Sequence, residues 1–199
     1  MKSIDIFRPK EWYGRGRLPH YDDGWSAQFL TMRLADSVPM KVIERWQREL
    51  EGLGEKGKIK MQKRIESYLD RGYGECHLGK RGIAEMVRDS LFFHDGDKYR
   101  LISWVIMPNH LHFLLRQSEG TELEEITHSL KSYTAQQANK ILGRRGEFWQ
   151  AETFDRFIRD GNHYRNTIRY IENNPVKARL CAAKEDWEFG SAWNVGNEV

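Results

Sequence analysis

Two histidines, His110 and His112, are the residues of this sequence best suited to hold a metal ion together. They lie in an apolar run that extends to Leu115 and is rich in residues that favour a strand. Side chains alternate along a strand, so both imidazoles project from one face and Leu111 points to the other. A catalytic metal also needs a further ligand and open positions for substrate. The same spacing occurs in histidines that simply lie on a sheet face, so the pair alone leaves both interpretations open.

Tyr170 and Asn174 lie four positions apart in a helix predicted over about 163–174, so their side chains share one face. A carboxamide oxygen is a hard ligand suited to Mg²⁺ or Mn²⁺. A phenol, with an ordinary pKa of about 10, is a feasible nucleophile towards phosphorus and a good later leaving group. Tyr133 and Gln137 have the same spacing in another predicted helix, and spacing cannot separate the two pairs.

Basic and aromatic side chains are interleaved over residues 130–179, which carry ten Lys and Arg against five Asp and Glu. Phosphates attract cations and unpaired bases stack on aromatic rings, so this composition suits single-stranded nucleic acid. Solvated cations around an aromatic core would give the same composition, and this alternative stays open. The basic residues expected to contact DNA in this stretch are Arg156, Arg159 and Lys177.

The chain of 199 residues has the size of one domain, a formal net charge of +3 and a mean hydropathy of −0.74. No apolar run approaches the roughly 20 residues that cross a bilayer, and the start lacks the apolar core of a signal peptide. We therefore expect a cytoplasmic protein without a membrane partner. Cys76 and Cys181 are far apart and predict neither a disulfide nor a cysteine-rich zinc site.

The predicted order of elements is strand, helices, two adjacent strands, helix, strand and helix, which favours an α+β fold with an antiparallel sheet and helices packed against it. We expect an irregular arm over residues 1–24 and a charged helical insertion over about 51–78, within a single domain of residues 1–199. Three tail aromatics are expected to anchor the C-terminal segment: Trp187, Phe189 and Trp193. The other expectations are strands over 25–34, 99–106 and 147–158, a tight turn over 107–109, and helix caps at Ser37, Thr121 and either Asp160 or Asn162.

Taken together, these motifs resemble those of the REP-associated tyrosine transposases, relatives of the single-tyrosine HUH transposases. The resemblance spans roughly residues 12–193. The combination of His-x-His with Tyr-Ile-x-x-Asn-Pro is much more specific than either part. The segments that carry it are Met107-Pro-Asn-His-Leu-His-Phe-Leu-Leu115, Tyr170-Ile-Glu-Asn-Asn-Pro-Val-Lys-Ala178 and the opening from Arg17 to Ser37.

The resemblance implies a ferredoxin-like core in which the histidine strand is central. It also implies that Tyr170 is the nucleophile and that His110, His112 and Asn174 bind a divalent metal, Mg²⁺ or Mn²⁺. Members of the family nick single-stranded DNA beside REP-type hairpins, form a 5′-phosphotyrosine and can rejoin strands. Because the family's N-terminal arms contact bases near the hairpin, the candidate DNA contacts here also include Arg15, Arg17 and His20.

One departure from the family is Arg179, where relatives commonly have glycine. It lies just beyond the catalytic helix and is expected to alter the backbone turn or add a phosphate contact. Two alternatives to a transposase remain: a catalytically silent hairpin-binding protein of the same fold, and a metal-dependent phosphohydrolase that uses water and in which Tyr170 is structural. A homodimer is compatible with the sequence in each case.

Overall fold

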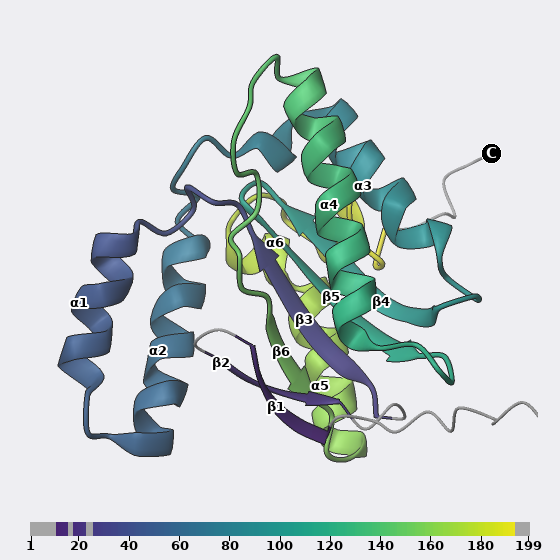
Figure 1. The fold of residues 1–199 in the computed structure, drawn as a ribbon. Helices are drawn as coiled ribbons and strands as arrows, with labels where there is room; N and C mark the ends of the chain where they lie inside the picture. Colours follow the sequence, from purple (N-terminus) through teal and green to yellow (C-terminus); the bar gives the residue numbers. More distant parts are fainter. Residues whose placement is uncertain (1–10, 16–17, 23–25, 194–199) are drawn as a thin grey trace, which may run out of the picture.

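The centre of the molecule is a four-stranded antiparallel sheet with the strand order β4-β5-β3-β6 (Figure 1). The computed structural model describes residues 11–15, 18–22 and 26–193. The predicted α+β class is confirmed, and the histidine strand β5 is one of the two inner strands. The four strands are β3 (Gln28–Arg33), β4 (Tyr99–Met107), β5 (His110–Gln117) and β6 (Phe154–Phe157).

Strands β4 and β5 are joined by a two-residue turn in which Met107 pairs with His110. Pro108 occupies the turn, where its lack of an N–H costs no ladder hydrogen bond. The predicted turn over 107–109 is therefore confirmed, and it sets the register that places His110 at the first position of β5.

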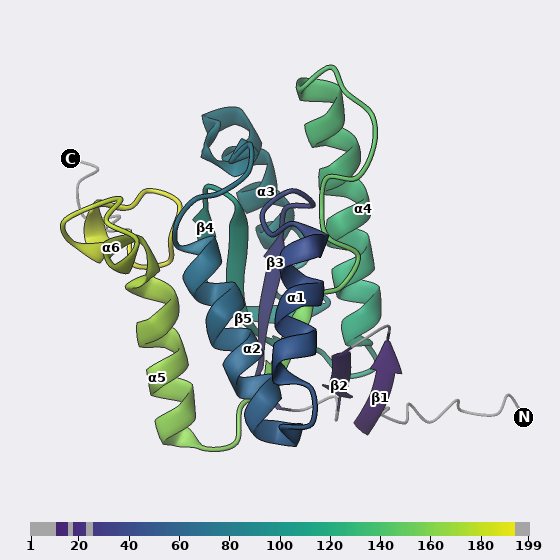
Figure 2. The same cartoon turned by 90° about the vertical axis from the view of Figure 1, so that its left-hand side faces the viewer.

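Helices cover both faces of the sheet (Figure 2). On one face, α3 (Arg81–Phe93) and α4 (Leu123–Ile141) bury the larger apolar core together with Leu111 and Phe113 of β5. On the other face, α5 (Gly161–Glu172) packs over a smaller core that includes Leu114. The short α6 (Asn174–Lys177) follows α5. The alternation of β5 thus directs Leu111 and Phe113 to α3 and α4 and leaves the face with the histidines and Leu114 toward α5.

A helical hairpin, α1 (Met40–Leu50) and α2 (Gly54–Leu69), stands beside the sheet rather than on either face (Figures 1 and 2). It has a small core of its own, centred on Ile43 and Trp46. Ser37 does not cap α1, as had been expected; its buried hydroxyl donates to the carbonyl of Leu34, and the helix begins after Pro39. A short 3₁₀ turn, η1 (His77–Gly79), connects this region to α3.

The N-terminal region differs from the predicted irregular arm. Strands β1 (Glu11–Arg15) and β2 (Leu18–Asp22) pair with each other in an antiparallel hairpin. Glycine and proline mark a turn between strands as well as they mark a loop, so composition alone did not reveal the pairing. The part of the expected arm over residues 1–10, 16–17 and 23–24 lies outside the described residues.

The expected last strand, 147–158, was too long. Only β6 joins the sheet, while Phe148 and Trp149 are buried in the larger core, where Trp149 makes one isolated bridge to Leu34. Aromatic residues favour strands because they suit half-buried surfaces, and here core packing uses them instead. Thr121 does not cap α4, which begins after Glu122; the carbonyl of Thr121 accepts from Gln117.

The C-terminal segment runs along the outer edge of β4, after the 3₁₀ turn η2 (Lys184–Asp186). Trp187 donates its indole N–H to the carbonyl of Ile106, and the amide of Ile106 donates to the carbonyl of Phe189. These two aromatics are anchors as predicted, whereas Trp193 is 42% exposed and is not. Gly190 pairs with Val105 in an isolated antiparallel bridge. Within the described ranges, the helices lack the combined length and apolarity that a membrane crossing requires.

The packing of β5 predicts that Leu111→Ala destabilises the fold by about 2–5 kcal/mol, because a fully enclosed side chain leaves a cavity when truncated. The matched control is Leu180→Ala, at a leucine that is 42% exposed, for which we expect a change within about 0.5 kcal/mol. Urea unfolding followed by circular dichroism measures both. Equal losses from the two variants would contradict this account of the core.

Candidate active site

His110 and His112 project from the same face of β5, as the alternation predicted. Their ring centroids are 4.6 Å apart, and each residue is only 1% exposed. Strand β3 lies alongside, with Arg33 opposite His110 and Thr31 opposite His112. The two imidazoles are therefore held on a rigid inner strand, within the layer between the sheet and α5.

A hydrogen bond at Nδ1 orients each imidazole. Nδ1 of His110 lies 2.7 Å from Oδ1 of Asn109, and Nδ1 of His112 lies 2.8 Å from the hydroxyl of Thr31. The amide nitrogen of Asn109 donates to the carbonyls of Leu69 and Tyr73, so its oxygen faces the ring. Because that oxygen accepts, Nδ1 of His110 carries the ring proton and Nε2 keeps its lone pair.

Tyr170 of α5 and Asn174 of α6 meet these histidines. The ring of Tyr170 lies 5.4 Å from that of His112 by centroid, and Phe29 packs edge-on against Tyr170 at 5.9 Å. Asn174 is fully buried and close enough to interact electrostatically with both His110 and Tyr170. The predicted helix over 163–174 is interrupted at Asn173, since Pro175 has no N–H to continue the ladder, yet Tyr170 and Asn174 still face one site.

Several polar atoms in this cluster are buried without a hydrogen-bond partner among the described residues: Nε2 of His110, the hydroxyl of Tyr170, and both Nδ2 and Oδ1 of Asn174. Asn174 affects the pKa of its neighbours, but the contacts fall short of hydrogen-bond geometry. An unsatisfied buried polar group costs about 1–3 kcal/mol. The cluster therefore leaves these atoms available for hydrogen bonds or for ligation.

Burial keeps all of these groups neutral. It lowers the pKa of His110 to about 3, with the positive charge of Lys177 adding to the effect, and it lowers the pKa of His112 well below its usual value. Burial also raises the pKa of Tyr170 far above that of a free phenol, and the carboxylates of Glu66 and Asp70 raise it further. The site is thus two neutral imidazoles, a carboxamide and a protonated phenol.

This donor set fits a divalent cation. Two imidazole nitrogens and an amide oxygen suit Mn²⁺ and related ions, and such a set leaves positions for phosphate oxygens. No group of three His, Cys, Asp or Glu that could hold a metal gathers in the described part of the chain. Among the described residues, the amide of Asn174 is the further oxygen donor that lies beside the two imidazoles.

The other predicted site residues are placed as follows. Lys177 forms an ion pair with Asp70 at 2.7 Å and lies 5.5 Å from the centroid of the Tyr170 ring. Arg156 in β6 and Arg159 just after it are exposed. Arg156 lies over the ring of Phe154 at 5.8 Å and Arg159 over that of Phe157 at 5.6 Å. Arg15 and His20 belong to β1 and β2, but their side chains, and all of Arg17, lie outside the described residues.

The competing pair is not at this site. Tyr133 lies on α4, which packs on the opposite face of the sheet, and its side chain is 52% exposed. It lines a groove with residues of α3, including Ser90 and Phe93. The geometry thus separates the two tyrosines where spacing could not.

Arg179, the departure noted from the sequence, has a φ of 60°. In this left-handed conformation glycine is favoured, so the arginine at this turn holds a strained backbone conformation. Its neighbour Leu180 donates back to the carbonyl of Pro175, which closes the turn after α6.

Sequence reasoning did not assign a role to Thr31, Arg33 or Asn109. Thr31 and Arg33 share one face of the first predicted strand, but only the register of β3 against β5 places that face beside the histidines. Asn109 precedes the histidine pair and was taken only as a turn residue. In all three cases the missing information was a contact between residues distant in the chain.

The fold and this site can now be compared with known proteins. Residues 90–174 match the profile of a family described as "Transposase IS200 like", a segment that runs from the end of α3 to Asn174. Comparison with curated proteins found no match. This segment, less than half of the chain, is similar to the IS200-like transposases.

Among solved structures, the chain is similar to a REP-associated tyrosine transposase bound to a REP hairpin. The TM-score is 0.50 at 18% sequence identity, over 90% of this chain and 81% of that one. A structure described as a transposase from Deinococcus radiodurans R1 covers 81% of this chain and 98% of its own at 17% identity, with a TM-score of only 0.34. The resemblance to the REP-associated tyrosine transposases is confirmed.

The buried imidazoles predict a specific acid sensitivity. His110 has a lower pKa when folded than when unfolded, so its contribution to stability is complete above the unfolded pKa of about 6.5 and is lost as the pH falls toward 3. We expect the free energy of unfolding, measured in EDTA, to fall by up to about 1.4 kcal/mol per pH unit for this group. His110→Gln should lessen that slope between pH 6 and 4. An unchanged slope would show that His110 is not buried in the neutral form.

Proposed function

We propose that this protein is a metal-dependent endonuclease and strand transferase that acts on single-stranded DNA beside hairpins, with Tyr170 as its covalent nucleophile. The observation that supports this most is the meeting of Tyr170, His110, His112 and Asn174 in one buried cluster. In it, Nε2 of His110, the Tyr170 hydroxyl and the Asn174 amide have no hydrogen-bond partner among the described residues. A protein that only binds DNA has no physical need for such an arrangement.

His110, His112 and Asn174 are the residues that would hold the metal, through Nε2 of His110, a nitrogen of His112 and the amide oxygen. When bound, a divalent cation supplies a Lewis acid that polarises the scissile phosphate and neutralises charge on its oxygens. Hydrogen bonds with Asn109 and Thr31 at Nδ1 fix the orientation of the two rings and leave each Nε2 as the nitrogen that would bind the metal.

Tyr170 supplies the attacking oxygen. Its hydroxyl forms a bond to phosphorus and gives up its proton, while the bond from phosphorus to the 3′ oxygen breaks and that oxygen gains a proton. The products are a 5′-phosphotyrosine and a free 3′-OH. Attack of a 3′-OH on the phosphotyrosine reverses these bonds and rejoins strands. Burial raises the pKa of Tyr170 and keeps the phenol neutral where it packs against Phe29 and His112, so the proton must leave the hydroxyl as the bond to phosphorus forms.

On this proposal, one chain would supply every residue of the site. The nucleophile comes from α5, the amide from α6 and the imidazoles from β5 of the same molecule. A second copy is therefore not needed to supply Tyr170, and the proposal applies to a monomer as well as to a homodimer.

For the hairpin, the proposal rests on the relative that binds a REP hairpin and on the basic residues near the site. We propose REP-type hairpins as the DNA partner. Arg15, Arg17 and His20 on or near the β1–β2 hairpin would contact bases at the foot of the stem, and Arg156, Arg159 and Lys177 would contact the unpaired strand.

Tyr170→Phe should abolish the covalent adduct with a labelled hairpin oligonucleotide in Mn²⁺, because no other described group would donate the attacking oxygen. Tyr133→Phe, the matched change on α4, should form the adduct as the wild type does. Denaturing gels that detect the protein–DNA species measure both. Adduct formation by Tyr170→Phe would contradict the assignment, and metal-independent binding with no adduct in the wild type would favour the catalytically silent binder.

Alanine substitutions of two adjacent asparagines, Asn174 and Asn173, test the proposed metal site. Asn174→Ala removes the buried amide and should weaken Mn²⁺ binding about 10- to 100-fold, as measured by isothermal titration calorimetry. Asn173→Ala removes an exposed amide that bonds only the carbonyl of Arg169, so it should bind Mn²⁺ normally. Equal affinity in the two variants would show that the carboxamide of Asn174 is not a ligand.

A further inference from the structure

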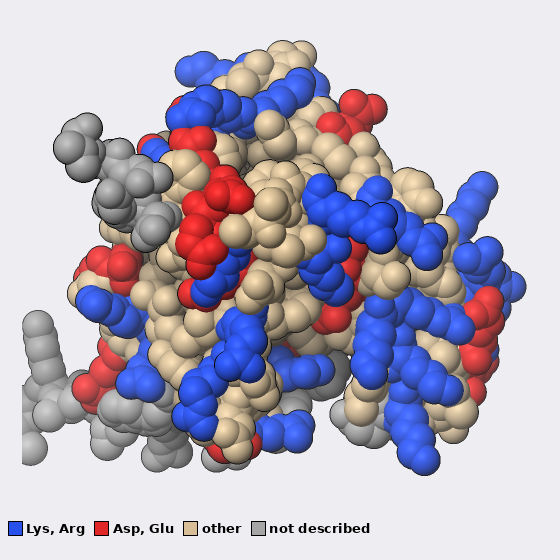
Figure 3. Space-filling view, turned by 180° about the vertical axis from the view of Figure 1, so that it is seen from behind, with Lys and Arg blue, Asp and Glu red and all other residues tan. Residues whose placement is uncertain are grey.

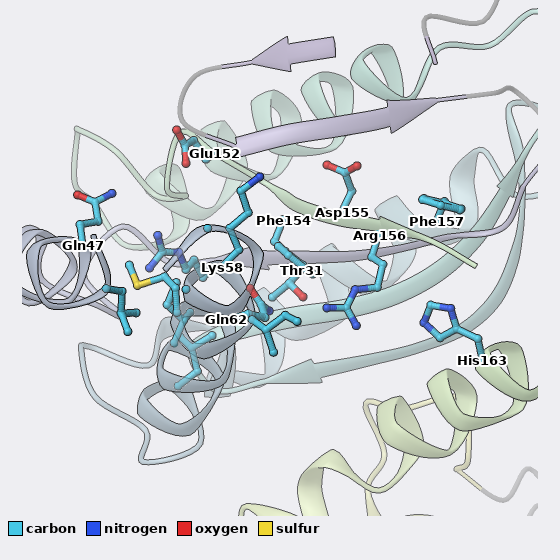
Figure 4. A pocket seen from close by; sticks show the side chains of 18 of the residues that line it. Thr31, Gln47, Lys58, Gln62, Glu152, Phe154, Asp155, Arg156, Phe157 and His163 are labelled. Atoms are coloured by element: carbon cyan, nitrogen blue, oxygen red, sulfur yellow. The ribbon is translucent and has the colours of Figure 1, made fainter. Parts of the chain in front are cut away.

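A long groove runs between the α1–α2 hairpin and the sheet edge formed by β6 (Figure 4). Its volume is about 710 Å³, within the size of cavities that hold nucleotide-sized groups. Lys58 and Gln62 of α2 line one wall, and Phe154 and Arg156 of β6 line the other. Seen from behind, Lys and Arg side chains gather on both sides of a hollow, over α2 on one side and over α5 on the other (Figure 3).

The inner side of this groove meets the proposed active site. Thr31, which bonds His112, is part of the groove wall. Leu69, whose carbonyl accepts from Asn109, lines it from α2. The ion pair of Lys177 with Asp70 ties the end of α2 to α6 as well. The helical hairpin is therefore fixed relative to the histidines, and a strand lying in the groove would reach the site at a defined place.

At the inner side of the groove, the side chain of Arg33 has a hydrogen-bond donor that is not used. It pairs in register with His110 and lines the groove, yet its Nη1 atom is buried without a hydrogen-bond partner. Burial lowers the pKa of Arg33, which the nearby charge of Glu152 partly offsets. A guanidinium with an open donor beside a phosphodiester site is suited to a phosphate oxygen.

The outer part of the groove combines cations with flat rings. Arg156 lies over Phe154 and Arg159 over Phe157, which leaves each guanidinium held beside an aromatic face. This pairing suits phosphates and unpaired bases in alternation. The groove is also lined by three acidic residues, Glu152, Asp155 and the α5 cap Asp160. Its charge is therefore not uniformly positive, and a nucleic-acid strand would be attracted only where the cations lie.

We propose that this groove carries the unpaired DNA strand to the active site, and that Arg33 binds a phosphate next to the one that is cleaved. The inference rests on the proposed function, since it assigns the path of that substrate. It also gives the α1–α2 hairpin a role, as the wall that confines the strand.

Binding without cleavage tests the groove directly. Fluorescence anisotropy would follow a labelled oligothymidine of about 12 nucleotides on Tyr170→Phe protein in EDTA, at several salt concentrations. Adding Arg33→Gln or Arg156→Gln should weaken binding at least about tenfold. Each change should also reduce the steepness of the salt dependence by about 0.7 in log–log slope. Arg33→Lys should keep that slope but still lose affinity, because the charge stays and the fork is lost.

The matched control is Lys63→Gln, a loss of the same charge from an exposed position of α2 outside the groove, which should leave binding unchanged. Since Arg156 is exposed, its variant tests the groove even if Arg33→Gln fails to fold. Unchanged binding in Arg156→Gln and Arg33→Lys would overturn the proposal, as would a loss confined to duplex hairpin DNA. Adduct formation by the otherwise wild-type protein is scored separately, so a failed groove and a failed enzymatic mechanism give different results.

Discussion

The pairing of β3 with β5 is the interaction on which the site depends. Antiparallel register places Thr31 beside His112 and Arg33 beside His110, so one face of two inner strands carries the two imidazoles, a ring-orienting hydroxyl and a guanidinium. A slip of one residue would send all of these side chains into the opposite layer, among the apolar residues against α3 and α4. The apolar residues Leu111 and Phe113 oppose that slip, because their burial requires the observed register.

The second feature of the site is that its polar groups are buried in their uncharged forms. The imidazoles, the carboxamide of Asn174 and the phenol of Tyr170 are all uncharged and enclosed, and their polar atoms are incompletely bonded. Because these atoms do not bond one another, a ligand that bonds them would gain the free energy of those interactions. The unbonded polar atoms therefore lower the stability of the fold in favour of binding. The burial of apolar side chains on the other face of the sheet compensates for this loss of stability.

Local periodicity was enough to predict the histidine face, the turn at 107–109 and the shared face of Tyr170 and Asn174, because each depends on neighbours within one element. The α+β class followed from the order of elements. What could not be predicted was carried by contacts distant in sequence. Asn109 bonds the end of α2, and Arg33 acquires its place only from strand register. The N-terminal hairpin and the short β6 were missed because composition does not distinguish a turn from a loop, or a core aromatic from a strand aromatic.

The C-terminal segment has a consequence for association. By bonding Ile106 and bridging Val105, it occupies the outer edge of β4 with backbone partners from its own chain. An exposed edge strand is a template on which a second molecule can extend the sheet. Along this stretch of β4 the edge is already paired, so two copies cannot join their sheets there unless the C-terminal segment is first displaced.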